Sequence, residues 1–371
     1  MKVQEVIFPD VNGENKIRYM LLDSHGNPII PAIKYLKYLD DIGRRPNTLK
    51  TYCYHLKLYF EFLKEAEQLY TDANFRLLAR FIGWLRNPYS KENVSPMMPV
   101  TALRSENTVN AIMTCVKGFY DFLERTDNID QDILKDITKE SSQKRITFKP
   151  FLHHITKDKK IEKNILKIKP PKRNIKTLTQ AQIQSIHQGC SNIRDRLILH
   201  VLYEGGLRIG ELLSLWIEDF NISNNSIRVR ESKSDAGEGR LVYVSENTIN
   251  LFQDYIIDIH TSNFDTNFVF VNLSGPNKGK PLKYWAVRSF VIRIINKCGV
   301  DFTPHMLRHT YATEMHKYGV DAAILRKLLG HAQVQTTIGM YVHPSDETIR
   351  EEYQAAQENK QRKRKHEKSN D

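Results

Sequence analysis

The stretch from Gly205 to Glu211 contains an arginine in surroundings that suit the binding of an anion. Gly205 and Gly206 let the backbone come close to a ligand, and Arg208 follows them at the expected start of a helix, whose end amides add positive potential. A guanidinium stays charged and can bind two phosphate oxygens at once. An arginine after two glycines is also common as an ordinary surface residue, so Arg208 gains meaning only from the segments that follow it.

Lys233 lies near the tip of an expected β-hairpin, where a turn can carry its ammonium group into a groove. This compact group can give a proton to a departing oxygen. The alternative is that a lysine at a hairpin tip only protects a sheet edge and keeps the protein in solution. Because Asp235 and Glu238 lie close by in the sequence, Arg240 is a second candidate for the proton donor.

The segment Thr303–Thr310, with the sequence TPHMLRHT, is the most specific local pattern. A spacing of i, i+3 in a helix places His305 and Arg308 on one face, so a group that transfers protons and a second phosphate ligand can converge. His305 and His309 are four residues apart, as in a zinc-binding helix. However, residue 306 is methionine where a metalloprotease would need its glutamate.

Two further groups follow toward the C-terminus. His331 comes directly after Gly330, which is expected to end a helix, and Tyr341 comes ten residues later. The chain has 17 tyrosines, so only its place after the arginine, lysine and histidine segments favours Tyr341. His331 and His343 would extend the histidine pair to four imidazoles, but no acidic ligand lies nearby in the sequence. The sequence has no G-x-x-x-x-G-K-[ST] motif either, so nucleotide hydrolysis has no visible machinery. We therefore expect no metal and no other cofactor.

The elements that must position these groups are expected to be mainly helical. Thr179 and Gln182 form a capping-box pattern, and Gly205-Gly206 interrupts the helical spacing that spans 191–216. Alternating apolar residues on both sides of a turn predict a β-hairpin over 226–244. Helical spacing returns at 246–260, 282–297, 305–318, 321–329 and about 346–358. This pattern predicts a mainly α-helical second domain with one small sheet over residues 177–358.

The N-terminal half has its own organisation. Short β-prone pieces and turns predict a small hairpin-like arm over 1–30, and helical periodicity predicts a helical domain over 31–150, with Asn47 as a helix N-cap. The similar segments 47–65 and 107–125 indicate two amphipathic helices whose aromatic residues belong to the core. A basic linker containing Pro170-Pro171 is expected over 151–176, and a polar basic tail over 359–371.

Composition limits the class of protein. A chain of 371 residues has room for two or three domains, and 55 Lys+Arg against 43 Asp+Glu leave a net charge of +12, which favours a polyanionic partner. A hydrophobic content of 40% is that of a globular protein. Four cysteines without a Cys-x-x-Cys pair suit a reducing compartment. No long apolar run is present, so we expect a soluble, cytoplasmic protein with no membrane partner.

The series Arg208, Lys233, His305-x-x-Arg308, His331 and Tyr341 closely resembles the tyrosine recombinase (phage integrase) family over roughly residues 175–345. Length and N-terminal pattern are similar to the family's transposon-encoded members. The resemblance implies a helical core-binding domain for 31–150 and an α+β catalytic domain for 177–358.

It also implies catalytic roles. Tyr341 would attack a DNA phosphodiester and form a 3′-phosphotyrosyl bond, Arg208 and Arg308 would hold the nonbridging oxygens, and Lys233 would protonate the departing 5′ oxygen. His305 and His331 would assist proton transfer. Glu211 would position the helix that begins at Arg208.

The implied partners are double-stranded DNA, further copies of the chain in a tetrameric synapse, and accessory transposition proteins. Two alternatives share the fold. One is a type IB topoisomerase-like enzyme that relaxes supercoils without choosing sites. The other is a catalytically silent DNA-binding regulator, against which the presence of all six candidate groups argues.

Overall fold

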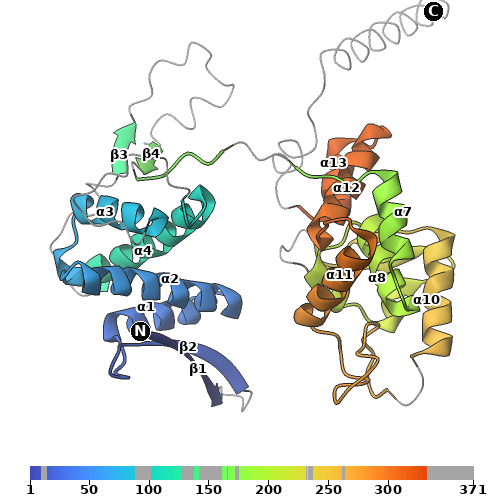
Figure 1. The fold of residues 1–371 in the computed structure, drawn as a ribbon, viewed down its shortest axis with the longest axis horizontal. Coiled ribbons are helices and arrows are strands. Elements are labelled where there is room, and N and C mark those ends of the chain that lie inside the picture. The colour runs from blue at the N-terminus through green and yellow to red at the C-terminus, as the bar shows by residue number, and fades with distance from the viewer. Residues whose placement is uncertain are drawn as a thin grey trace, which may run out of the picture. The chain divides into compact units, whose positions relative to one another are not determined.

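The structure is a computed structural model that divides into two compact units, Met1–Lys172 and Arg173–Asp371 (Figure 1). It describes residues 1–9, 15–87, 102–126, 138–141, 161–164, 166–171, 175–230, 232, 237–260 and 264–331. Lys233 and Tyr341 lie outside the described residues, as do the expected helix over 346–358 and the basic tail over 359–371. The division between the units falls within the basic segment 151–176.

In its described ranges, the first unit combines a β-hairpin with four helices. Strands β1 (Lys2–Pro9) and β2 (Asn15–Leu22) pair antiparallel, with Lys2 opposite Leu22 and Pro9 opposite Asn15. The helices are α1 (Ile30–Asp41), α2 (Pro46–Glu65), α3 (Phe75–Arg86) and α4 (Glu106–Thr126), with a 3-10 turn at Tyr70–Asp72. A second antiparallel pair joins β3 (Thr138–Ser141) to β4 (Ile161–Asn164).

The core of this unit lies between α2 and α4. Tyr59 and Phe119 are fully buried and Phe62 nearly so, which confirms that the aromatic residues of the two similar segments belong to the core. The hairpin packs on the same core, because Leu21 of β2 is fully buried there and Arg18 of β2 forms an ion pair with the buried Asp40 of α1.

Helix α2 begins two residues earlier than the sequence indicated. Arg45 is its N-cap and Pro46 occupies the first turn, so Asn47 lies inside the helix and its prediction as the N-cap was wrong. Proline suits the first turn, since its fixed φ is helical and its missing N–H would have had no partner in the helix.

The second unit is mainly helical and, among its described residues, contains a three-stranded antiparallel sheet in the order β5-β6-β7. Its elements are α7 (Gln180–Gln188), α8 (Ile193–Glu204), α9 (Ile209–Leu213), a 3-10 turn at Ile217–Asp219, β5 (Phe220–Asn221), β6 (Ser226–Arg228), β7 (Leu241–Tyr243), α10 (Glu246–Asp258), α11 (Tyr284–Cys298), α12 (Pro304–Lys317) and α13 (Ala322–Leu329). The prediction of mainly α structure with small sheets is confirmed. Among the helices described, none combines the length and the apolar character needed to cross a bilayer.

Helix α8 is the central helix of this unit. Leu197, Ile198 and Leu199 point in successive directions around its axis, yet all are fully buried, so the helix is covered on nearly all sides. Helices α10 and α12 both pack against it (Figure 1).

The predicted capping box at Thr179 is also confirmed. The Thr179 backbone N–H donates to Gln182 Oε1 at 2.9 Å, and Gln182 N–H donates to Thr179 Oγ1 at 3.3 Å. This pair of hydrogen bonds fixes the N-terminus of α7, the first described helix of the second unit.

Candidate active site

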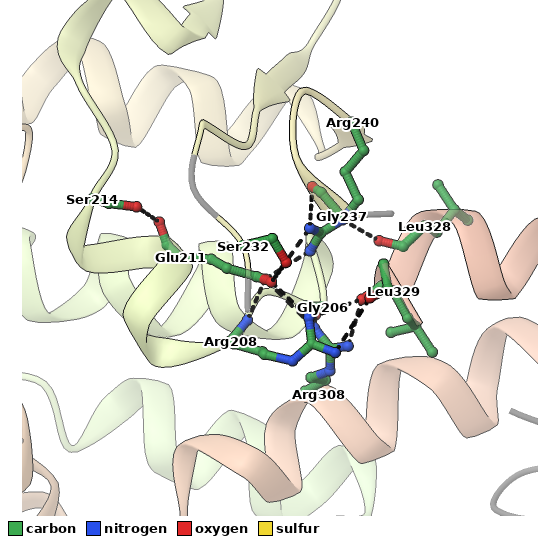
Figure 2. Close-up of polar contacts among 11 residues, drawn as sticks. Gly206, Arg208, Glu211, Ser214, Ser232, Gly237, Arg240, Arg308, Leu328 and Leu329 are labelled. Carbon is green, nitrogen blue, oxygen red and sulfur yellow. Dashed lines mark hydrogen bonds and ion pairs between the residues drawn. The ribbon is translucent and has the colours of Figure 1, made fainter. Parts of the chain in front are cut away.

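A buried carboxylate, Glu211 of α9, is the centre of a cluster of arginines in the second unit (Figure 2). Arg208 is the N-cap residue of α9, as the glycine-containing motif predicted. Its Nη1 donates to Glu211 Oε1 at 2.7 Å and its backbone N–H donates to Oε2 at 2.9 Å. The Arg208 side chain is 23% exposed, so it is held from inside while part of it faces solvent.

Arg308 of α12 reaches the same centre from another part of the chain. Its Nη1 donates to the carbonyl oxygen of Gly206 at 2.7 Å and lies 3.7 Å from Glu211 Oε2. Its Nη2 donates to the carbonyl oxygen of Leu329 at 2.6 Å. The second arginine of the predicted pair is therefore 2% exposed and fixed in place before any ligand binds.

The turn at Gly206 makes this approach possible. Gly206 adopts a left-handed conformation with φ +58°, which L side chains rarely adopt. A Cβ at this position would lie 2.7 Å from Tyr311 Cε1 of α12, closer than real atoms pack. Only glycine lets the turn before Arg208 contact the helix that carries Arg308.

A third arginine, Arg240, enters from the hairpin side, directly before β7. Its Nη2 donates to Glu211 Oε2 at 2.7 Å, and Ser232, from the other arm of the hairpin, donates its hydroxyl to Oε1 at 2.8 Å. Sequence reasoning named Arg240 as an alternative proton donor and missed Ser232, for which the only available signal was its place next to Lys233.

The charge of Glu211 is stabilised by this setting. Burial alone would raise its pKa, but hydrogen bonds and the positive charges of Arg240 and Arg208 outweigh burial and lower the pKa to about 2. Glu211 therefore stays ionised at neutral pH and acts as an acceptor for donors from three segments. This arrangement agrees with the expectation that it positions the start of α9.

His331 follows Gly330, the left-handed C-cap of α13, and is 8% exposed. Its backbone N–H donates to the carbonyl oxygen of Arg326 at 3.1 Å, which fixes the residue to the last turn of the helix. Burial and then the charges of Arg308, Arg208 and Arg240 lower the pKa of its imidazole to about 4. His331 is thus neutral at pH 7, in the form that can accept one proton and donate another.

His305 lies in the first turn of α12 with an exposed side chain, and its ring meets that of His309 edge-on, with ring centroids 4.9 Å apart. His309 in turn contributes to lowering the pKa of His331. The structure thus brings Arg208, Arg308 and His331 together and places His305 one helical turn from Arg308. In the described ranges, no group of three His, Cys, Asp or Glu side chains has a metal-binding arrangement.

The cluster can therefore bind an anion beside a neutral imidazole, and comparison with known proteins gives the class. Residues 176–348 match the model of the phage integrase family, and residues 32–127 match its N-terminal SAM-like domain. The chain belongs to the phage integrase family of tyrosine recombinases, as the motif series indicated.

The chain is similar to several individual members of this class, and some of them are transposon-encoded. The chain is 40% identical over 371 residues to transposase A from transposon Tn554 of Staphylococcus aureus, covering 98% of this chain and 100% of the relative. It is 29% identical to the tyrosine recombinase XerA of Saccharolobus solfataricus, over 68% of this chain and 88% of that one. Among solved structures, the Tn1549 transposon integrase shares the fold with a TM-score of 0.61 and 18% identity, covering 88% of this chain and 98% of that chain.

Proposed function

We propose that the chain exchanges DNA strands at specific sites, through a covalent 3′-phosphotyrosyl intermediate, to integrate or excise a mobile element. The Tyr341 hydroxyl oxygen attacks phosphorus, the bond from phosphorus to the 5′ oxygen breaks, and that oxygen takes a proton from Lys233. The proton of the tyrosine passes to an imidazole, with His305 and His331 as candidates. Attack by another 5′-hydroxyl then reverses these steps and joins a new strand without ATP.

The observation that carries this proposal is the convergence of Arg208 and Arg308 on Glu211, with His331 beside them. These three residues come from segments that are far apart in the sequence, and buried contacts fix two of them before substrate arrives. A phenol with an ordinary pKa of about 10 is a poor nucleophile at neutral pH, so it needs both a base and neighbouring cations. The cluster supplies both, and its imidazole, His331, comes ten residues before Tyr341 in the sequence.

Related structures support the choice of partner. The Tn1549 integrase was solved in complex with transposon right end DNA, and a lambda integrase as a dimer bound to a COC′ core site. A net charge of +12 favours the same kind of polyanion here. We propose double-stranded DNA as the substrate and a homo-oligomer, a tetramer at the synapse, as the active assembly.

The test is covalent trapping on a nicked duplex made from the DNA that flanks the encoding element. Cleavage next to the nick releases a short strand, so the adduct cannot religate and appears as a shifted band on a denaturing gel. We expect the native chain to form the adduct. Tyr341→Phe should still bind the DNA but form no adduct.

Three outcomes would contradict the proposal. An adduct formed by Tyr341→Phe would refute the nucleophile, and binding without any adduct would point to a silent regulator. Relaxation of a supercoiled plasmid that lacks the flanking DNA, at the rate seen with it, would favour a type IB topoisomerase.

A further inference from the structure

We propose that Arg240 is a positioning residue that holds the lysine-bearing segment of the hairpin against the rest of the active site, and that it is not the proton donor. This inference rests on the proposed function, because it concerns the step in which the 5′ oxygen leaves. It concerns a residue whose side chain is only 7% exposed and whose bonds lead to three separate segments.

The contacts of Arg240 join the hairpin, α9 and α13. Its Nη1 donates to the carbonyl oxygen of Gly237 at 2.8 Å, within the hairpin, and its Nε donates to the carbonyl oxygen of Leu328 at 2.9 Å, in α13. Its Nη2 donates to Glu211 at 2.7 Å, in α9 (Figure 2). A planar guanidinium with five donors can bond three acceptors in fixed directions, which a lysine ammonium on a flexible stem cannot do.

These bonds hold both ends of the segment that contains Lys233. On one side of residues 233–236, Ser232 donates its hydroxyl to Glu211 Oε1 at 2.8 Å. On the other side, Gly237 accepts from Arg240, which is itself bonded to Glu211. Ser232 and Gly237, the residues on either side of the lysine-bearing segment, are therefore both linked through one carboxylate to α9, directly or by way of Arg240.

The same arginine lies against the residue before His331. A Cβ on Gly330 would come within 2.8 Å of Gly237 Cα and 2.9 Å of Arg240 Nη1, so the backbone of the hairpin packs directly on the C-cap of α13. Arg240 thus lies at the junction between Gly237 of the hairpin and the turn that carries His331. A change there should disturb the acid first and the remaining site to a lesser degree.

Proton donation by Arg240 itself is chemically unfavourable. A guanidinium stays protonated in proteins, whereas an efficient general acid gives up its proton readily near the working pH. Its donors toward Gly237, Leu328 and Glu211 also point inward to protein acceptors. Arg240 therefore acts through the position of Lys233.

A DNA substrate with sulfur in place of the bridging 5′ oxygen tests this role. A thiolate leaves without a proton, so loss of the acid slows cleavage of the oxygen substrate but not of the sulfur substrate. We expect Lys233→Ala to cleave the oxygen substrate about 10²-fold or more slowly than the native chain and to recover on sulfur. Arg240→Gln should lose more activity on oxygen than on sulfur, and should recover only in part.

Arg228→Gln is the matched control, because Arg228 is an exposed residue on β6 of the same sheet, and it should cleave both substrates as the native chain does. If Arg240→Gln does not fold, Arg240→Lys makes the same comparison, since it keeps a positive charge beside Glu211 but cannot bond three acceptors at once.

Each other outcome has a separate meaning. Equal losses of Arg240→Gln on both substrates would leave only a structural role and overturn the inference. Full recovery of Arg240→Gln on sulfur, with Lys233→Ala active on oxygen, would make Arg240 the acid. Failure of the native chain to form an adduct with either substrate would count against the proposed function itself.

Discussion

The guanidinium of Arg308 donates a 2.6 Å hydrogen bond to the carbonyl oxygen of Leu329, the last residue of α13. The other end of the same guanidinium is bonded to Gly206, in the turn before Arg208. One side chain therefore fixes the distance between the first arginine of the site and the turn that carries His331. Arg308 therefore also holds together the two turns that form the site.

Arg308→Lys is expected to destabilise the fold by about 1–3 kcal/mol, because a lysine leaves one of the two buried carbonyl oxygens without its donor. The measurement is urea unfolding followed by circular dichroism. Arg288→Lys is the control, since Arg288 is exposed on α11, and its free energy of unfolding should match that of the native chain. Equal stability of the two variants would show that the contacts of Arg308 contribute nothing to the fold.

Gly206→Ala is expected to lower the free energy of unfolding by more than about 2 kcal/mol, since it combines a positive φ with a clash against the Tyr311 ring. Gly210→Ala serves as the matched control, because Gly210 lies four residues away in α9 and an added Cβ meets nothing within 4 Å there. Thermal unfolding of the two variants side by side makes the measurement. A Gly206→Ala protein as stable as Gly210→Ala would contradict the close approach of the turn to α12.

The stability of the second unit should fall with acid below pH 6.5, through a histidine outside the active site. His187 of α7 packs against His200 of α8, with ring centroids 4.2 Å apart, and its Nδ1 is buried without a hydrogen-bond partner in the part of the chain that the structure describes. Burial and then the neighbouring His200 lower the pKa of His187 to about 4. The unfolded chain therefore binds a proton at higher pH than the folded chain does.

Because the folded pKa is depressed, the stabilisation is complete above pH 6.5 and is lost as the pH falls from 6.5 to about 4. His187→Asn should remove about 1–3 kcal/mol of this pH dependence, measured as the difference in urea unfolding between pH 7 and pH 4.5. His25→Asn, in an exposed turn of the first unit, should leave it unchanged. An identical pH profile for His187→Asn and the native chain would rule out this assignment.

Local patterns predicted the elements of the second unit well, because the signals that define them are themselves local. The capping box at Thr179, the break at Gly205-Gly206 and the N-cap place of Arg208 each depend on residues within one or two turns. The error at Asn47 has the same origin, since Pro46 offered a competing helix start two residues earlier than an N-cap at Asn47 implies.

Such local patterns could not predict the hydrogen-bond network around Glu211. Arg240 and Leu328 are 88 residues apart, and nothing in the sequence near Arg240 says that its guanidinium turns toward α13 instead of toward a substrate. Chemical type and proximity to Lys233 favoured a direct role in proton transfer. Only the tertiary packing shows which acceptors its donors meet.

The three arginines around Glu211 have a consequence for what the cluster prefers to bind. Three positive charges and one negative charge leave a net +2. A phosphodiester carries a single negative charge and would leave this excess half neutralised, whereas the five-coordinate phosphorus formed during attack carries a second one. If the cluster binds the scissile phosphate as proposed, full compensation is reached only at the top of the reaction barrier, and the cluster would be complementary to the transition state and not to intact DNA.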